Sequence, residues 1–205
     1  MRRGARTLLI ERDRPGGECT FTGCVPSKAL IEAAAQRRSF AEALVAMRSA
    51  VTAIAASEDA GALEHEGVEL LSASARFVAP RTLAAGTRTV RARRVVLATG
   101  SAPALPPIPG LAESGYLTNE SVFELERLPA SLVVLGGGPV GCELAQAFAR
   151  FGAEVHLVGS GEPVLSKEEP AASAVIAAAL EGRRGGAPPW PPCQRGARHR
   201  RERRR

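Results

Sequence analysis

Two cysteines near the start of the chain, Cys19 and Cys24, are the residue type best suited to redox chemistry. Glycines flank the pair, and Pro-Ser-Lys follows at 26–28 before an apolar helical pattern. Proline pre-sets φ for a first helical turn, and the positive partial charge of a helix N-terminus lowers the pKa of a nearby thiol. Because the thiolate is the reactive form, this pattern predicts a working dithiol.

Two other interpretations of the cysteines stay open: half of a zinc site, or two unrelated buried residues. A structural zinc site takes four ligands. The remaining cysteines, Cys142 and Cys193, stand alone and do not form a second pair at ligand spacing. The dithiol interpretation is therefore favoured, and no metal site is predicted.

The segment 16–28 resembles the redox-active motif of the flavin-dependent pyridine nucleotide-disulfide oxidoreductases, the family of dihydrolipoamide dehydrogenase and mercuric reductase. The family pattern is close to Gly-Gly-x-Cys-x-Asn-x-Gly-Cys-x-Pro-Ser-Lys, and this sequence departs from it at Phe21, where Asn is usual. The resemblance covers about residues 5–182. It implies electron flow from NAD(P)H through FAD to a Cys19–Cys24 disulfide. Cys24 would be the thiol nearer the flavin, and Cys19 the thiol that exchanges with substrate.

A glycine-rich loop follows the apolar run at 132–135. Gly136, Gly138 and Gly141 form the pattern G-x-G-x-x-G, and a helical pattern follows. In this context the glycines permit a tight turn and a close approach of the backbone to a pyrophosphate at a helix N-terminus. The resemblance implies that NAD(P)H binds here. Residues 159–161 hold neither an acid for NAD nor a base for NADP, so the sequence does not choose between them.

Further site residues follow from the resemblance. For those of them that are charged, the alternative interpretation is an ordinary side chain in contact with solvent. The residues implied to contact FAD are Glu11, Gly17, Thr99 and Gly100, and those implied to be catalytic are Cys19, Cys24, Lys28 and Glu143, the last two as a pair beside the flavin.

The elements that must position these residues alternate between strands and helices. Short apolar runs predict buried parallel strands, and longer Ala-rich stretches with helical spacing predict helices. The expected elements are strands at 8–11 and 94–98, two helices within 29–57 broken near 37–39, strands within 68–90 with a turn near 84–86, a proline-rich connection at 103–109, and a strand–helix–strand unit at 131–160.

This order predicts an α/β fold in which a Rossmann-like FAD-binding unit precedes part of a second Rossmann-like NAD(P)-binding unit. We expect a partial FAD-binding domain with the redox-active disulfide at 1–118, a partial NAD(P)-binding domain at 119–182, and a disordered Arg/Pro-rich tail at 183–205. The first strand and glycine loop of the FAD unit are expected to be lacking. The dimerisation domain through which family members form homodimers is also expected to be lacking.

The net charge of +6 is concentrated in the tail. From residue 183 onward nine Arg stand against one Glu, giving +8, which leaves −2 for the rest. Such a tail could bind nucleic acid, but a shifted reading frame in GC-rich DNA gives the same Arg, Pro and Gly bias, and nucleic-acid binding is not favoured.

Four cysteines without a signal peptide indicate a reducing, cytoplasmic setting. The longest apolar run, 171–180, is shorter than the ~18 to 20 residues that cross a bilayer, so no membrane segment is expected.

The resemblance implies an FAD-dependent disulfide oxidoreductase that acts on a small-molecule dithiol or disulfide, or on a metal ion such as Hg(II). Because the first flavin loop is expected to be lacking, this chain is expected to be an inactive fragment of such an enzyme. The alternative is a non-catalytic remnant or a weak nucleotide-binding module.

Overall fold

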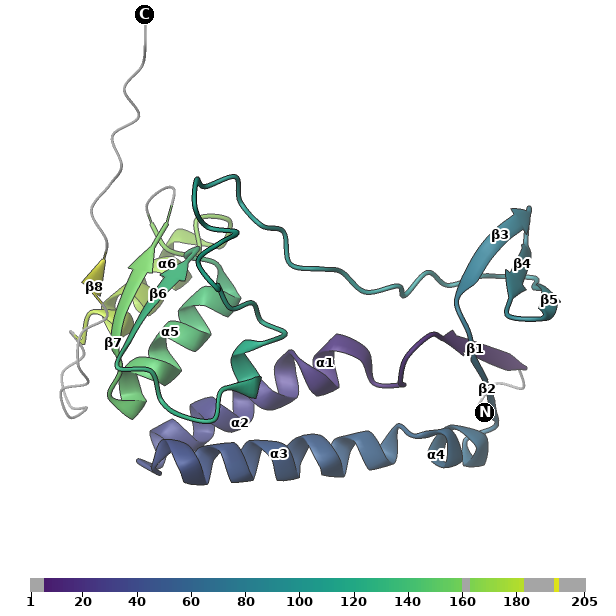
Figure 1. The fold of residues 1–205 in the computed structure, drawn as a ribbon, viewed down its shortest axis with the longest axis horizontal. Coiled ribbons are helices and arrows are strands. Elements are labelled where there is room, and N and C mark those ends of the chain that lie inside the picture. The colour runs from purple at the N-terminus through teal and green to yellow at the C-terminus, as the bar shows by residue number, and fades with distance from the viewer. Residues whose placement is uncertain (1–5, 160–162, 183–193, 196–205) are drawn as a thin grey trace, which may run out of the picture. The chain divides into compact units, whose positions relative to one another are not determined.

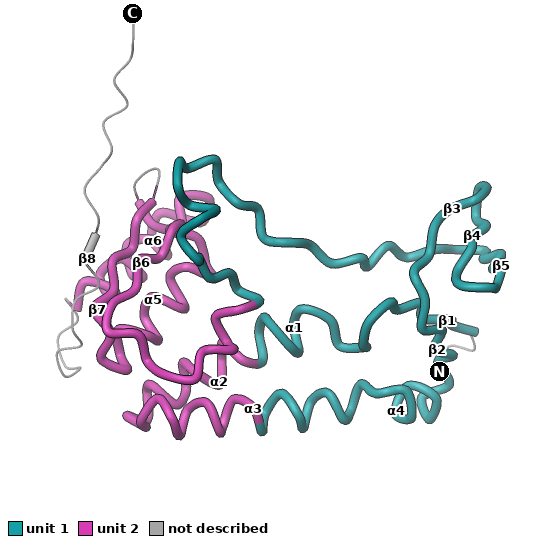
Figure 2. The backbone as a smooth tube through the Cα atoms, in the orientation of Figure 1, with its two compact units in different colours: residues 1–25, 49–120 teal, residues 26–48, 121–205 magenta. Residues whose placement is uncertain are grey.

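The computed structural model describes residues 6–159, 163–182 and 194–195. Its helices and strands confirm an α/β chain (Figure 1). The chain divides into two compact units (Figure 2). Unit 1 holds residues 1–25 and 49–120, and unit 2 holds residues 26–48 and 121–205.

The redox motif follows β1 (Thr7–Glu11), which belongs to a small parallel sheet in unit 1. β1 pairs in parallel with β2 (Val68–Ser72), which confirms the strand expected at 8–11. α4 (Ala60–His65) leads into β2. Asp59 caps this helix, because its carboxylate accepts a hydrogen bond from the Ala62 N–H at 2.8 Å.

A second sheet in unit 1 is an antiparallel meander. Its strands are β3 (Ala75–Ala79), β4 (Thr82–Ala85) and β5 (Arg88–Arg91). The turn expected near 84–86 is confirmed, since β4 ends and β5 begins there. A second turn, which the sequence did not indicate, joins β3 to β4 through Arg81, whose φ is 61°.

Two helices, α2 (Cys24–Ala35) and α3 (Phe40–Ser57), confirm the broken helical stretch. Arg37, with φ of 58°, lies in the break. A capping box then starts α3: the Ser39 N–H donates to the Glu42 carboxylate at 2.8 Å, and the Glu42 N–H donates to the Ser39 hydroxyl at 3.3 Å. The hydrogen bonds that the Ser39 hydroxyl and N–H donate lower the pKa of Glu42.

Unit 2 contains the expected strand–helix–strand unit. β6 (Ser131–Leu135), α5 (Pro139–Phe151) and β7 (Glu154–Val158) follow one another, and β6 and β7 pair in parallel. α6 (Pro170–Leu180) comes next, and β8 (Gln194–Arg195) pairs with β7. Alternate residues of β6 point to opposite faces, so Leu132 and Val134 pack on the core while Val133 and Leu135 are exposed.

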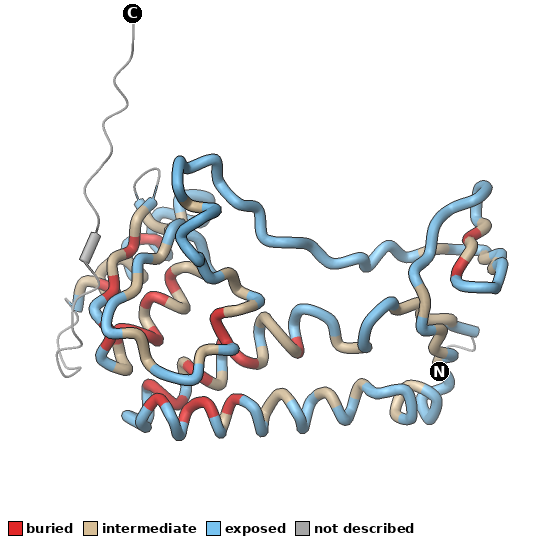
Figure 3. Tube along the Cα trace, in the orientation of Figure 1, coloured by how far each residue is buried: buried red, intermediate tan, exposed pale blue. Residues whose placement is uncertain are grey.

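The core of unit 2 forms where α2, the start of α3, α5 and β7 meet, and Figure 3 shows the buried residues gathered there. Phe148 of α5 is 1% exposed. Its ring centroid lies 5.8 Å from that of Phe40, which also meets Phe151 edge-on at 5.3 Å. On α5 the buried residues Cys142, Ala145 and Phe148 recur at helical spacing, so one face of the helix faces the core.

The two units divide the chain differently from the expected domains. Residues 26–48 belong with unit 2, because Leu30, Phe40 and Met47 are part of its core. The assignment of an FAD-binding and an NAD(P)-binding domain stays a prediction. The expected disordered tail, 183–205, lies outside the described residues apart from Gln194–Arg195.

The buried strand expected at 94–98 is wrong. Residues 92–108 form no helix or strand, and Val96 and Leu97 are 87% and 71% exposed. A buried parallel strand needs neighbours to pair with and layers to cover both faces. Among the described strands none pairs with 94–98. The proline-rich connection at 103–109 is confirmed as irregular chain.

Among the described residues, one stretch, Phe40–His65, is long and apolar enough to cross a bilayer, by length and composition only. Core helices of water-soluble proteins have the same length and composition. Here Phe40, Ala43, Leu44 and Met47 are buried in the core of unit 2. The stretch is therefore weak evidence for a membrane segment.

Phe148→Ala should lower the free energy of unfolding by about 3–5 kcal/mol, because it removes a fully buried ring and leaves a cavity. Urea unfolding of the 205-residue chain, followed by circular dichroism, measures the loss. Val45→Ala in α3 is the matched control: Val45 is 65% exposed, and its truncation should cost less than about 0.5 kcal/mol. Equal losses in the two variants would contradict the core described above.

Candidate functional site

The two cysteines of the redox motif lie on either side of a tight reversal of the chain. Cys19 is the third residue of α1 (Gly17–Phe21), and Cys24 is the first residue of α2. A Cβ added at Gly23 would lie 2.8 Å from the Glu18 carbonyl oxygen and 3.2 Å from the Cys19 Cα. Only glycine lets the backbone return this closely. The reversal brings Cys24 back beside Cys19.

Both cysteines are exposed, and neither forms a disulfide. The pKa of the Cys19 thiol is raised, mainly by its side-chain hydrogen bond with Cys24 and then by desolvation; the charges of Cys24 and Glu58 act in the same direction. Sulfurs already in hydrogen-bond contact need only a small movement to reach the ~2.05 Å of a disulfide. This is the geometry of a reduced dithiol.

Two contacts of α1 involve Glu18, which precedes Cys19, and Phe21, which lies two residues after it. The Glu18 carboxylate accepts hydrogen bonds from the Ser101 hydroxyl at 3.3 Å and from the Asn119 amide at 3.2 Å. The Arg14 guanidinium lies 3.5 Å from the centroid of the Phe21 ring, a cation–π contact. Phe21, the one notable departure from the family pattern, thus connects α1 to Arg14, which precedes the helix.

A third contact ties α1 to the end of α3. The Thr20 hydroxyl donates to the Glu58 carboxylate at 2.6 Å, and Thr20 is only 2% exposed. Sequence reasoning missed Glu58, since 38 residues separate it from Thr20 and no motif includes it. Its only sequence signal is an acid just after a long helical pattern, which is common.

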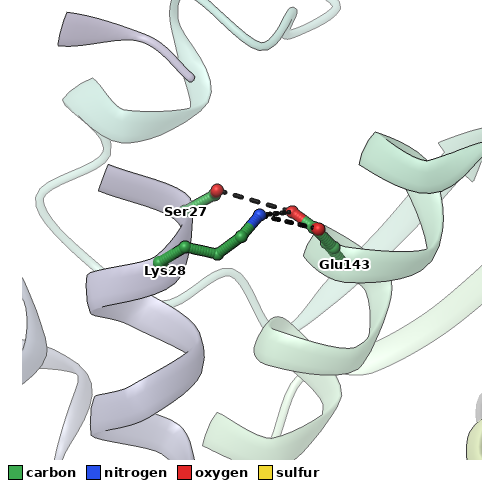
Figure 4. A network of polar contacts seen from close by, with 3 residues as sticks. All are labelled: Ser27, Lys28 and Glu143. Atoms are coloured by element: carbon green, nitrogen blue, oxygen red, sulfur yellow. Dashed lines mark hydrogen bonds and ion pairs between the residues drawn. The ribbon is translucent and has the colours of Figure 1, made fainter. Parts of the chain in front are cut away.

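The structure brings Lys28 and Glu143 together, as the resemblance implies (Figure 4). Lys28 Nζ donates to both carboxylate oxygens of Glu143 at 2.7 Å, and the hydroxyl of buried Ser27 donates to one of them at 3.4 Å. Both charged side chains keep contact with solvent, so the pair contributes only about 0–1 kcal/mol to stability. Its role beside a flavin stays a prediction.

The glycine loop at 136–141 joins β6 to α5. Gly136 has φ of 116°, and a Cβ added at Gly141 would overlap the Gly136 carbonyl oxygen, so the loop is closed too tightly for a side chain there. A Cβ added at Gly138 would meet nothing within 4 Å. α5 begins at Pro139 without a side-chain cap. An open approach to an uncapped helix N-terminus suits a phosphate.

The residues implied to contact FAD lie at separate points of unit 1. Glu11 ends β1, and its carboxylate accepts a hydrogen bond from the Asp13 N–H at 2.9 Å. Gly17 begins α1 with φ of 57°. Thr99 and Gly100 lie in the exposed irregular segment 92–108, and so they do not stand at the end of a strand. Their roles stay predictions.

Within the described part of the chain, no group of three or more His, Cys, Asp and Glu side chains could hold a metal ion. Of the positions expected to distinguish NAD from NADP, Ser160 and Gly161 lie outside the described residues.

The sequence profile of the pyridine nucleotide-disulphide oxidoreductase family matches residues 1–185. The chain belongs to this family. Its members are oxidoreductases that use FAD and NAD(P)H. The match covers both the cysteine motif and the glycine loop, which the structure places in units 1 and 2.

Similar proteins within the family include mercuric reductases. The enzyme from Shigella flexneri is 38% identical over 201 residues, which cover 86% of this chain and 36% of that protein. The enzyme from Bacillus cereus is 33% identical over 193 residues, which cover 86% of this chain and 31% of that protein. The chain thus spans about a third of the length of these curated relatives.

Among solved structures, the Cu(II) complex of the HOCl-induced flavoprotein disulfide reductase RclA from Escherichia coli is similar to this chain. The TM-score is 0.77 and the sequence identity is 27%. The similarity covers 88% of this chain and 42% of that one. It confirms the Rossmann-type α/β fold class expected from the sequence.

The two cofactors of the family fit this structure unequally. The loop at 136–141 offers an open helix N-terminus for the pyrophosphate of a nicotinamide dinucleotide. The residues implied for FAD do not fit that group as they stand, because Thr99 and Gly100 are not held in a sheet.

Gly138→Ala should weaken NADH binding by at least about tenfold, because its methyl group occupies the space through which a pyrophosphate approaches the helix. The same change should leave the unfolding free energy within about 0.5 kcal/mol. Gly141→Ala is the matched comparison: its methyl group collides with the Gly136 carbonyl and should cost about 1–3 kcal/mol of stability. Fluorescence titration with NADH and urea unfolding measure the two effects. Equal NADH binding by Gly138→Ala and the unchanged chain, or no binding by either, would contradict the cofactor loop.

Proposed function

We propose that this chain carries the thiol–disulfide exchange centre of an FAD-dependent disulfide oxidoreductase, with Cys19 and Cys24 as the redox pair. The observation that best supports the proposal is the hydrogen-bonded cysteine pair at the chain reversal of Gly23. Both thiols are exposed, so a substrate can reach them. Family membership supports the same chemistry.

The exchange with a disulfide substrate would take two steps. Once Cys19 loses its proton, its sulfur attacks one substrate sulfur; the substrate S–S bond breaks, and a substrate thiolate leaves and takes up a proton. Cys24 then attacks the Cys19 sulfur of this mixed disulfide and releases the second substrate thiol. The pair ends as a disulfide, having given two electrons and two protons to the substrate.

In the whole protein, electrons for the pair would come from NAD(P)H through FAD, as in the family. By the resemblance, Lys28 and Glu143 would be the pair beside the flavin, and their 2.7 Å ion pair supports that assignment. Because Glu143 neutralises Lys28, the pair would present an oriented dipole to whatever lies beside it.

The substrate class we propose is a small dithiol or disulfide, or a metal ion. Mercuric reductases and a flavoprotein disulfide reductase are among the similar proteins, and exposed thiols suit both classes. A reducing, cytoplasmic compartment fits a disulfide that must cycle. From family membership we also propose that the whole protein is a homodimer.

A second candidate function is a nucleotide-binding module without catalysis. The observation that favours it is the contrast between a completed glycine loop at 136–141 and the expected strand at 94–98 that does not form. The NADH titration with Gly138→Ala tests this candidate separately from the cysteines.

Oxidised glutathione should convert Cys19 and Cys24 into an internal disulfide, with two glutathione thiols released per chain. The reason is that the two side chains are already in hydrogen-bond contact. Buried Cys142 should stay unmodified. Peptide mass mapping after alkylation measures both, and Cys24→Ser, which should stop at a mixed glutathione disulfide on Cys19, is the control. Mixed disulfides that persist on both cysteines of the unchanged chain would refute the redox pair.

The 205-residue chain alone should purify colourless or with substoichiometric flavin, and it should lack NAD(P)H-dependent reductase turnover. The structural reason is that Thr99 and Gly100 lie in exposed irregular chain, so FAD would lack positioned contacts there. Absorbance spectra and turnover with NADH and NADPH check this. Extension to the length of its relatives should restore both signals. A stoichiometric flavin spectrum from the 205 residues would show that the exposed segment folds onto the cofactor.

A further inference from the structure

Glu58 contacts α1 both before and after Cys19. Its Oε2 accepts the hydrogen bond of Thr20, the residue that follows Cys19. A Cβ added at Gly16, the N-cap of α1, would lie 2.6 Å from the same oxygen. The carboxylate is therefore packed against the entry of the helix while it holds the helix at its fourth residue.

Two groups outside α1 affect the pKa of the Cys19 thiol: Cys24 at the start of α2, and Glu58, which follows the end of α3. The hydrogen bond with Cys24 is the largest reason why the Cys19 pKa is raised, and the Glu58 charge adds to it. The other charged groups near the helix are Glu18, whose carboxylate accepts hydrogen bonds from elsewhere in unit 1, and Arg14, which stacks on an aromatic ring.

We propose that Glu58 is a positioning residue for Cys19: its hydrogen bond with Thr20 and its place beside Gly16 fix the helix that carries the thiol. The inference rests on the proposed thiol–disulfide exchange and deepens it. The carboxylate also brings a negative charge to the helix that carries Cys19, and such a charge disfavours the thiolate. Cys19 becomes the attacking nucleophile only when its proton leaves.

Two variants separate the two parts of this role. Glu58→Gln removes the charge but keeps an oxygen that can accept the Thr20 hydrogen bond. Thr20→Val removes the donor, keeps the side-chain shape and leaves the charge of Glu58 in place. A Glu58 that only stabilised the fold would change neither the pH at which Cys19 reacts nor its exchange equilibrium.

The first measurement is the rate of iodoacetamide alkylation of Cys19 across pH in the reduced 205-residue chain, read by peptide mass. A nearby negative charge disfavours the thiolate, so Glu58→Gln should move the Cys19 profile to lower pH. It should speed alkylation at neutral pH about two- to fivefold, the order of one screened surface charge. Asp59→Asn is the matched control: it removes the next carboxylate, which caps α4 and is replaced by an equally good cap, and the Cys19 profile should not move.

The second measurement is the glutathione equilibrium of the Cys19–Cys24 disulfide. Thr20→Val should disfavour the internal disulfide by at least about threefold, because a less fixed α1 lowers the effective concentration of one thiol at the other. If Glu58→Gln loses the helical circular dichroism signal, the glutathione equilibrium of Thr20→Val decides whether the contact with Glu58 positions Cys19.

An unchanged Cys19 profile in Glu58→Gln, or an unchanged equilibrium in Thr20→Val, would overturn the corresponding part of the role. The proposed function would still stand, provided that the unchanged chain forms the internal disulfide. A chain that does not form it at all would overturn the proposed function instead.

Discussion

The close return of the chain at Gly23 is the constraint on which the chemistry of unit 1 depends. The two cysteines are brought together by backbone, because the reversal leaves no room for a Cβ beside the Cys19 Cα. α1 has only five residues and could not persist as a helix in isolation. It must be held by contacts from outside, and Thr20, bonded to Glu58, is the most buried of the residues that supply them. The reversal makes the pair, and distant side chains keep it in place.

In unit 2 the corresponding constraint is apolar packing. Leu30 of α2 and Phe148 of α5 belong to one buried cluster, and each is 1% exposed. Burial of such side chains contributes about 1.5–3 kcal/mol each, several times the worth of an ion pair open to solvent. Lys28 and Glu143 therefore meet because the apolar faces of their helices meet. The geometry of a charged pair with a predicted catalytic role is thus a by-product of packing that involves no charge.

The parts of the fold that sequence reasoning predicted depend on neighbours close in sequence. The turn at 136–141 is set by its glycines, and the helix that follows it and the break near Arg37 are set by local residue spacing; all three form as expected. The strand expected at 94–98 failed because its apolar composition says nothing about whether a partner strand is present. The contact between Thr20 and Glu58 could not be predicted either, since it joins α1 to a residue 38 positions away, just after the end of α3, and leaves no periodic signal.

The same distinction explains why the glycine loop of unit 2 forms as expected while the segment expected at 94–98 in unit 1 does not. β6 and β7 are joined by one helix, so pairing of the strands and burial of Cys142, Ala145 and Phe148 come together within 131–158. Residues 94–98 have no such partner nearby, and Thr99 and Gly100 inherit the irregular conformation of that segment. The dithiol resembles the first case, because Cys19 and Cys24 are five residues apart and a glycine turn joins them. Its redox chemistry should therefore depend on this turn and on the contact of Glu58 with α1, and it should be separable by experiment from the flavin contacts that depend on strand pairing.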